Sequence, residues 1–202
     1  MAGRKARKGG ALALAGWAAL AAPCSVLLHE LGHFAAGQAL GYSPVLRPGS
    51  VSGGARLGQA PGWEVAVQAG AGPLVTILLT LTAIAAYRRG RARLPALALA
   101  AVAPVRILVA SLSLLFDTLA AVRGGTRGVP NFDEYNMAAG LGVPVQPLSV
   151  ALTLFLVAVW VWAWRRFPAR RAVSLAALVA GAAAGLAIWF NLVGPPLTSA
   201  LR

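Results

Sequence analysis

Five long apolar stretches, separated by short polar or basic connections, dominate the pattern of the chain. They cover residues 11–42, 63–87, 94–122, 148–164 and 172–193. A helix needs about 20 apolar residues to cross the hydrocarbon core of a bilayer, and these stretches approach or exceed that length. The pattern therefore predicts an all-α polytopic membrane protein with about five transmembrane helices. Because the first stretch is longer than one crossing requires, we expect its helix to tilt or to break near Pro23.

The connection after the first stretch differs from the others. Residues 43–62 are rich in Gly, Ser and Pro and contain short apolar–polar alternations. They predict a hairpin-like or re-entrant loop, which at membrane depth has to be covered by protein or line a wet cavity. Two pairs of small residues, Gly37 with Gly41 and Gly181 with Gly185, have the spacing that permits close helix contact. We expect one membrane-embedded domain over residues 11–202, preceded by a basic N-terminus at residues 1–10.

Composition and charge agree with a membrane location. The chain is 58% hydrophobic and 11% charged, against about 25% charged in ordinary soluble domains. Its net charge of +13 comes from short clusters beside the apolar stretches, which indicates contact with lipid headgroups and no nucleic-acid partner. Twelve of the 18 Lys and Arg residues lie in alternate connections, at residues 1–10, 88–93 and 165–171. This asymmetry predicts a cytoplasmic N-terminus. We expect an integral membrane protein, of a bacterial or archaeal cell membrane.

The strongest chemical feature is His-Glu-Leu-Gly-His at residues 29–33, inside the first apolar stretch. Two histidines four residues apart lie on one face of a helix, so both imidazoles can bind one metal ion. Glu30, between them, can reach a water on that metal and act as a base. His29 and His33 are the two histidines of the chain, and ionisable groups inside a membrane are costly and usually functional. The simpler alternative is a pair of histidines hydrogen-bonded within a helix bundle.

A metal site of this kind needs a third protein ligand, usually His, Cys, Asp or Glu. With both histidines used and Glu30 assigned as the base, the remaining acids are Glu64, Asp117, Asp133 and Glu134. The predicted topology puts all four on the same side of the membrane as the histidines, so position alone leaves each of them open. For Asp117, an ion pair with Arg106 or with an arginine of a loop is the simpler explanation.

Two further stretches of the sequence indicate a resemblance to a known family. Residues 69–74 contain Ala-Gly-Ala-Gly-Pro-Leu in the second apolar stretch, and residues 133–144 begin with an acid and end in Gly-Val-Pro. Together with residues 29–36 and the loop at residues 43–62, they make the chain resemble the site-2-protease-like membrane metalloproteases. These are peptidase family M50 and its small M50B-like relatives. The resemblance covers about the first 145 residues, and its His-Glu-x-x-His and Ala-Gly-Pro elements are specific as a pair.

The resemblance implies an intramembrane zinc metalloprotease that hydrolyses peptide bonds of transmembrane or membrane-associated protein substrates. It implies His29, His33 and Asp133 as the Zn²⁺ ligands, with Glu134 as the alternative third ligand. It also implies Glu30 as the general base and acid.

Four other residues are expected to support the site or to line a substrate channel. They are Gly72, Pro73, Asp117 and Asn191. Two other functions stay open. One is a metal-binding but proteolytically inactive M50-like membrane chaperone or regulator, against which Glu30 argues because a structural site needs no base. The other is a small transporter, with Arg106, Asp117 and Asn191 along a polar path. The sequence leaves the oligomeric state open.

Overall fold

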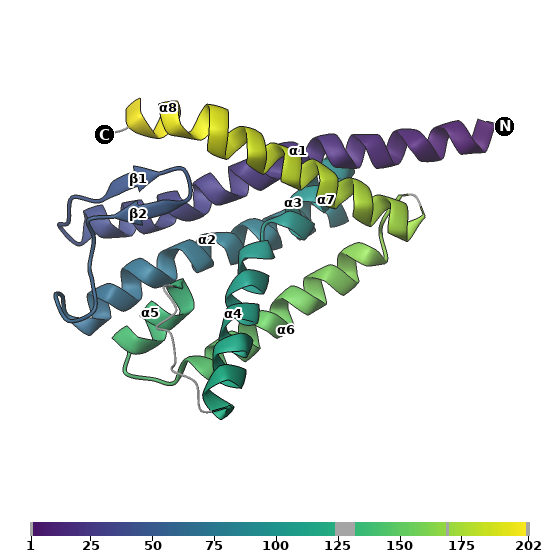
Figure 1. The fold of residues 1–202 in the computed structure, drawn as a ribbon. Coiled ribbons are helices and arrows are strands. Elements are labelled where there is room, and N and C mark those ends of the chain that lie inside the picture. Colours follow the sequence, from purple (N-terminus) through teal and green to yellow (C-terminus); the bar gives the residue numbers. More distant parts are fainter. Residues whose placement is uncertain (1, 124–131, 169, 201–202) are drawn as a thin grey trace.

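The computed structural model describes residues 2–123, 132–168 and 170–200. The described chain is nearly all helical, with one small β-hairpin (Figure 1). Its elements are α1 (Ala2–Ala39), β1 (Val45–Arg47), β2 (Ser50–Ser52), α2 (Gly62–Arg88), α3 (Arg93–Val102), α4 (Val105–Val122), α5 (Asp133–Gly140), α6 (Val145–Trp164), α7 (Arg171–Ile188), the π-helical turn η1 (Trp189–Val193) and α8 (Gly194–Ala200).

Within the described ranges, five helical stretches are long and apolar enough to cross a membrane. They are Gly10–Ala39, Gly62–Arg88, Arg93–Phe116, Val145–Trp164 and Arg171–Ser199. The predicted all-α architecture with about five spanning helices is confirmed, and the apolar helices indicate a membrane protein.

Prolines act differently in two of these stretches. Helix α1 continues unbroken through Pro23, so of the two expected alternatives, a tilt or a break, the break is wrong. Pro23 cannot donate a hydrogen bond to the carbonyl of Ala19, but Gly185 of α7 lies directly against that carbonyl oxygen. Proline is commonly tolerated in membrane helices because a neighbouring helix contacts the carbonyl oxygen that has lost its hydrogen bond. The third apolar stretch, in contrast, divides into α3 and α4 at Ala103 and Pro104.

The predicted hairpin after the first helix is confirmed. Strands β1 and β2 pair antiparallel, with Val45 opposite Ser52 and Arg47 opposite Ser50. The indole Nε1 of Trp189 donates a hydrogen bond of 2.7 Å to the carbonyl of Pro48 in the connecting turn. The hairpin is thereby fixed to the π-helical turn that follows α7.

The molecule has two distinct ends. At one end, on the left of Figure 1, the hairpin and α5 gather around the last turns of α1 and the first turns of α2. Towards the other end, α1, α3, α6 and α7 together enclose an apolar core. This core contains Leu14, Ala18, Ala22, Leu97, Ala98, Ala101, Val102, Ala163 and Leu178. Helices α1 and α7 run parallel there, and the predicted close contact is made by Gly181 against Ala15 and by Gly185 against Ala19.

Candidate metal centre

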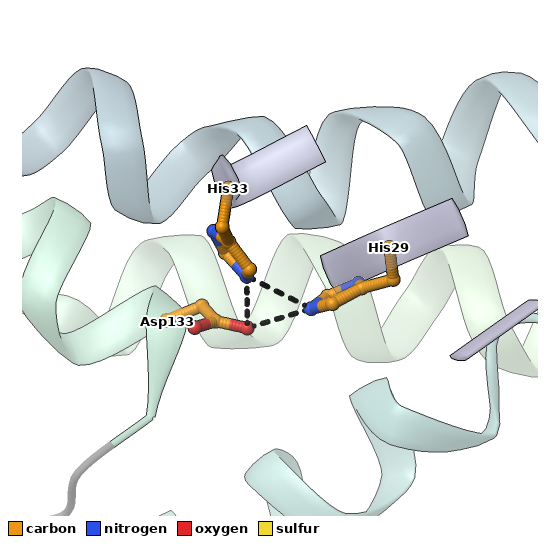
Figure 2. Close-up of side chains that lie close together, drawn as sticks. All are labelled: His29, His33 and Asp133. Atoms are coloured by element: carbon orange, nitrogen blue, oxygen red, sulfur yellow. Dashed lines mark hydrogen bonds and ion pairs between the residues drawn. The ribbon is translucent and has the colours of Figure 1, made fainter. Parts of the chain in front are cut away.

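Three side chains from two distant parts of the chain converge inside the helix bundle. His29 and His33 project from one face of α1, and Asp133 is the first residue of α5 (Figure 2). The two Nε2 atoms lie 3.1 Å apart, and Asp133 Oδ2 lies 2.9 Å from the Nε2 of His29 and 3.3 Å from that of His33. Both histidines are buried, with exposed fractions of 3% and 6%.

These separations fit a single metal ion. Ligand atoms about 2.0–2.1 Å from a tetrahedral zinc ion lie about 3.3 Å from one another. The three observed separations are within a few tenths of an ångström of that value. Two imidazoles and one carboxylate are also a donor set that catalytic zinc sites use, with a fourth position left for water. The three residues therefore can hold a metal ion.

The second nitrogen of each ring has a partner that orients it. His33 Nδ1 donates to the backbone carbonyl of Gln68 at 2.7 Å, and His29 Nδ1 lies 2.9 Å from the hydroxyl oxygen of Thr76. Because a carbonyl only accepts, Nδ1 of His33 carries its proton and Nε2 of the neutral ring presents a lone pair. That lone pair faces a carboxylate oxygen, an arrangement that requires either a second ring proton or a cation between them. Metal-binding histidines are typically held by such outer partners.

Gly72 of α2 provides the space for both rings. A Cβ at this position would lie 2.3 Å from Nε2 of His33 and 2.7 Å from Nε2 of His29, closer than real contacts allow. Gly72 is one of the residues expected to support the site or to line a substrate channel, and in the structure it permits close approach of the two imidazoles.

The two acids at the start of α5 have opposite environments. Burial acts to raise the pKa of the Asp133 carboxyl, but its interactions with His29 and His33 outweigh burial and hold that pKa well below its ordinary value. Burial raises the pKa of the neighbouring Glu134, and this residue is not in the converging group. Of the two alternative third ligands, Asp133 is the one that lies beside the histidines.

Glu30 lies on the same helix turn, almost fully buried, and forms an ion pair with the guanidinium of Arg106 on α4. The second terminal nitrogen of Arg106 lies 3.9 Å from Asp133 Oδ2. Among the described side chains, the one that forms a close ion pair with Arg106 is Glu30. The ion pair suggested for Asp117, with Arg106 or a loop arginine, stays a prediction. The side chain of Asp117 lies outside the described residues.

Two cavities meet at this group of residues. One of about 640 Å³ is lined by polar groups, including Glu30, His33, Gln68 and residues 49–57 of the hairpin and the loop after it. The other, of about 360 Å³, is lined mainly by apolar side chains of α1, α3 and α4, and also by His29. Arg106 and Asp133 line both cavities. The possible metal position therefore has a polar approach and an apolar approach.

Comparisons of the chain with known proteins found no match. No protein-family model matches the chain, no curated protein matches it, and no solved structure matches it. The resemblance to family M50 stays a prediction, and the function has to be argued from the side chains.

The remaining predicted residues are not all at the centre. Pro73 follows Gly72 and lines the apolar cavity. Asn191 is exposed in the π-helical turn and donates to the carbonyl of Ala187 in its own helix, so it is not brought to the site. Glu64 accepts a hydrogen bond from Tyr42 and is likewise not in the converging group.

Sequence reasoning missed two supporting residues on α2. Gln68 and Thr76 lie four residues before and after Gly72, so all three share one face of the helix. The side chain of Gln68 also accepts a 2.6 Å hydrogen bond from the backbone N–H of Ala55, which connects the loop after β2 to the partner of His33. The spacing of two polar residues around a glycine in an apolar helix was the signal that could have found them.

Proposed function

We propose that this protein is an intramembrane zinc metalloprotease that hydrolyses peptide bonds of membrane-associated protein substrates. The observation that supports this most is the convergence of His29, His33 and Asp133 on one point beside the buried Glu30. A site that only held structure would need the ligands but no base. The same group of residues supports membership of the M50-like proteases as a proposal.

Zinc is the metal that we propose, because two imidazoles and one carboxylate suit it and leave a coordination position open. When bound, zinc would lower the pKa of a water molecule towards about 7 and polarise the substrate carbonyl. Glu30 would accept a proton from the attacking water as the new oxygen–carbon bond forms. The same carboxyl would then return the proton to the amine nitrogen as the carbon–nitrogen bond breaks.

The two cavities support a substrate that lies partly in the membrane. The apolar cavity suits an apolar side chain, and the polar cavity gives water a path to Glu30. Strand β2, Ser50–Ser52, lines the polar cavity and can present backbone groups to an extended peptide. Surrounding lipid is the other partner that the exposed apolar faces of the helices require.

We also propose an integral protein of a bacterial or archaeal cell membrane. Its N-terminus would be cytoplasmic, which the asymmetry of basic residues supports. This orientation would put the hairpin on the outer side. Single cysteines at Ser52 and Gly90, in a Cys24→Ser background, test it with a membrane-impermeant thiol reagent applied to intact cells. Labelling at position 52 and protection at position 90 are expected, and the reverse pattern would overturn the orientation.

The protease itself is tested with purified protein in detergent and a mixture of synthetic transmembrane peptides, with products identified by mass spectrometry. The wild type should contain about one zinc per chain and cut peptides with uptake of ¹⁸O from labelled water. His29→Ala should lose the zinc. Glu30→Gln should keep zinc and lose cleavage, whereas Glu64→Gln, the matched control, should keep both.

Two results would contradict the proposal. If His29→Ala retained zinc, the proposed metal site would be contradicted. Zinc present without any cleavage by the wild type would favour the inactive regulator instead.

A further inference from the structure

Arg106 is a charged residue in an apolar membrane stretch, and its position is not explained by the metal ligands. It lies two residues after Pro104, where the third stretch divides into α3 and α4. One terminal nitrogen contacts Glu30, and the other lies 3.9 Å from Asp133 Oδ2, outside hydrogen-bond distance. Charged groups in such positions are costly and usually functional.

The guanidinium is also placed where a substrate would have to pass. The side chain of Arg106 is 40% exposed, whereas that of its partner Glu30 is 2% exposed. Arg106 lines both cavities, as Asp133 does, and Glu30 lines the polar one, so the N–H groups of Arg106 that do not contact Glu30 can reach the space beside these two acids. A peptide carbonyl attacked by a water that Glu30 deprotonates would lie in this space.

We infer that Arg106 is a catalytic residue that binds the oxyanion formed at the attacked carbonyl, an inference that rests on the proposed function. As the water oxygen bonds to the carbonyl carbon, its proton goes to Glu30 and the carbonyl π electrons move to the carbonyl oxygen. The guanidinium donates N–H groups to that oxygen. The carbonyl then re-forms, the carbon–nitrogen bond breaks, and the proton on Glu30 goes to the departing amine.

Arginine suits this role better than lysine does. Its guanidinium keeps its charge in apolar surroundings and has a rigid fork of donors. One arm can hold Glu30 while the other binds a second oxygen, which a single ammonium group does less well. Donors aimed at developing negative charge are typically the largest single contribution to catalysis.

The test compares Arg106→Gln and Arg106→Lys with the wild type and with Arg123→Gln, an exposed arginine just after the same helix. Turnover of a transmembrane peptide should fall about 100- to 1,000-fold in Arg106→Gln through kcat, with KM and zinc content little changed. The lysine variant, which can still pair with Glu30, should lose at least about tenfold. The Arg123 variant should match the wild type.

Inhibitor binding to the zinc-loaded protein separates oxyanion binding from a structural role. A phosphinic peptide carries the charged oxygens of the transition state, so Arg106→Gln should weaken its binding by about the same factor as kcat/KM. A peptide hydroxamate, which binds mainly by chelating the metal, should be affected less than tenfold.

Equal losses for both inhibitors, or an unchanged kcat in either Arg106 variant, would overturn the inference. If the wild type cuts no peptide, the proposed function fails. The phosphinic peptide still decides the role of Arg106 in that case, and a wild type that does not bind it would also overturn the inference.

Discussion

Helix α1 makes close contacts with a glycine of another helix in its first half and again towards its end, but the two contacts serve different purposes. Towards its start, backbone carbonyls of α1 lie against Gly181 and Gly185 of α7. Towards its end, the rings of His29 and His33 lie over Gly72 of α2. The absence of a side chain lets two backbones meet in the first case and leaves room for two metal-binding rings in the second. Substitutions at the two ends should therefore separate stability from metal binding.

The largest effect is expected for Gly72→Ala. Its Cβ would strike Nε2 of both histidines, which are movable side-chain ends, so the fold should survive while the rings leave their positions. Zinc affinity should fall by at least about 100-fold, beyond what the loss of an outer partner typically costs. Competition with a chelator of known affinity measures this.

Gly70→Ala is the matched control for that change, because its Cβ would meet only the flexible thioether of Met137. It should keep zinc affinity within a few fold. Wild-type zinc affinity in Gly72→Ala would show that the rings do not need the space that the structure assigns to them.

The architecture was largely predictable from the sequence, because apolar length fixes where a helix can cross a membrane. The hairpin loop followed from the Gly, Ser and Pro content of residues 43–62. The sequence did not predict that α1 continues through Pro23 whereas the third stretch divides at Pro104. Both are prolines in apolar stretches, and only tertiary contacts distinguish them. At Pro23, Gly185 of the neighbouring helix α7 lies against the carbonyl oxygen of Ala19, which receives no hydrogen bond from the proline.

The candidate site was predictable where local spacing determines it. His29, Glu30 and His33 share one helix turn, so their proximity needed no tertiary information. The nearness of Asp133, 104 residues from His29, depends on how α5 packs on α2, and residue spacing alone left several acids open. The Glu30–Arg106 pair depends in the same way on the division of the third stretch at Pro104.

At the other end of α1, Gly185→Ala should destabilise the fold and spare the metal. Its Cβ would lie 2.0 Å from the carbonyl oxygen of Ala19, which is backbone and cannot rotate away. Overpacking of this kind typically costs about 1–3 kcal/mol of unfolding free energy. Unfolding in mixed micelles with increasing SDS measures the loss, and zinc content should remain about one per chain. If Gly185→Ala lost zinc but kept its stability, the contact with α7 would serve metal binding and not the fold, contrary to this prediction.

A smaller change, Thr76→Val, tests the orientation of His29. The substitution keeps the shape of the side chain and removes the hydroxyl 2.9 Å from Nδ1. Loss of such an outer partner typically lowers metal affinity by about 10- to 100-fold. Thr80→Val, one turn later, removes a hydroxyl that donates to the carbonyl of Thr76, so its zinc affinity should stay close to that of the wild type. Equal affinities for both variants would mean that Thr76 does not hold the ring.

The smallest effect is expected for Gly16→Ala, on the same helix as the tight contact with α7. Apart from the backbone of its own helix, no atom of the described residues lies within 4 Å of a Cβ at this position, so the methyl group meets open space there. Alanine favours a helix over glycine by up to about 1 kcal/mol, and the unfolding free energy should rise by that amount or stay unchanged. The same unfolding measurement as for Gly185→Ala checks it. A loss above about 0.5 kcal/mol, larger than surface substitutions usually cause, would mean that this face of α1 is covered. The covering surface would then belong to a second copy of the chain or another protein, and close packing by small residues would extend to a second face of the helix.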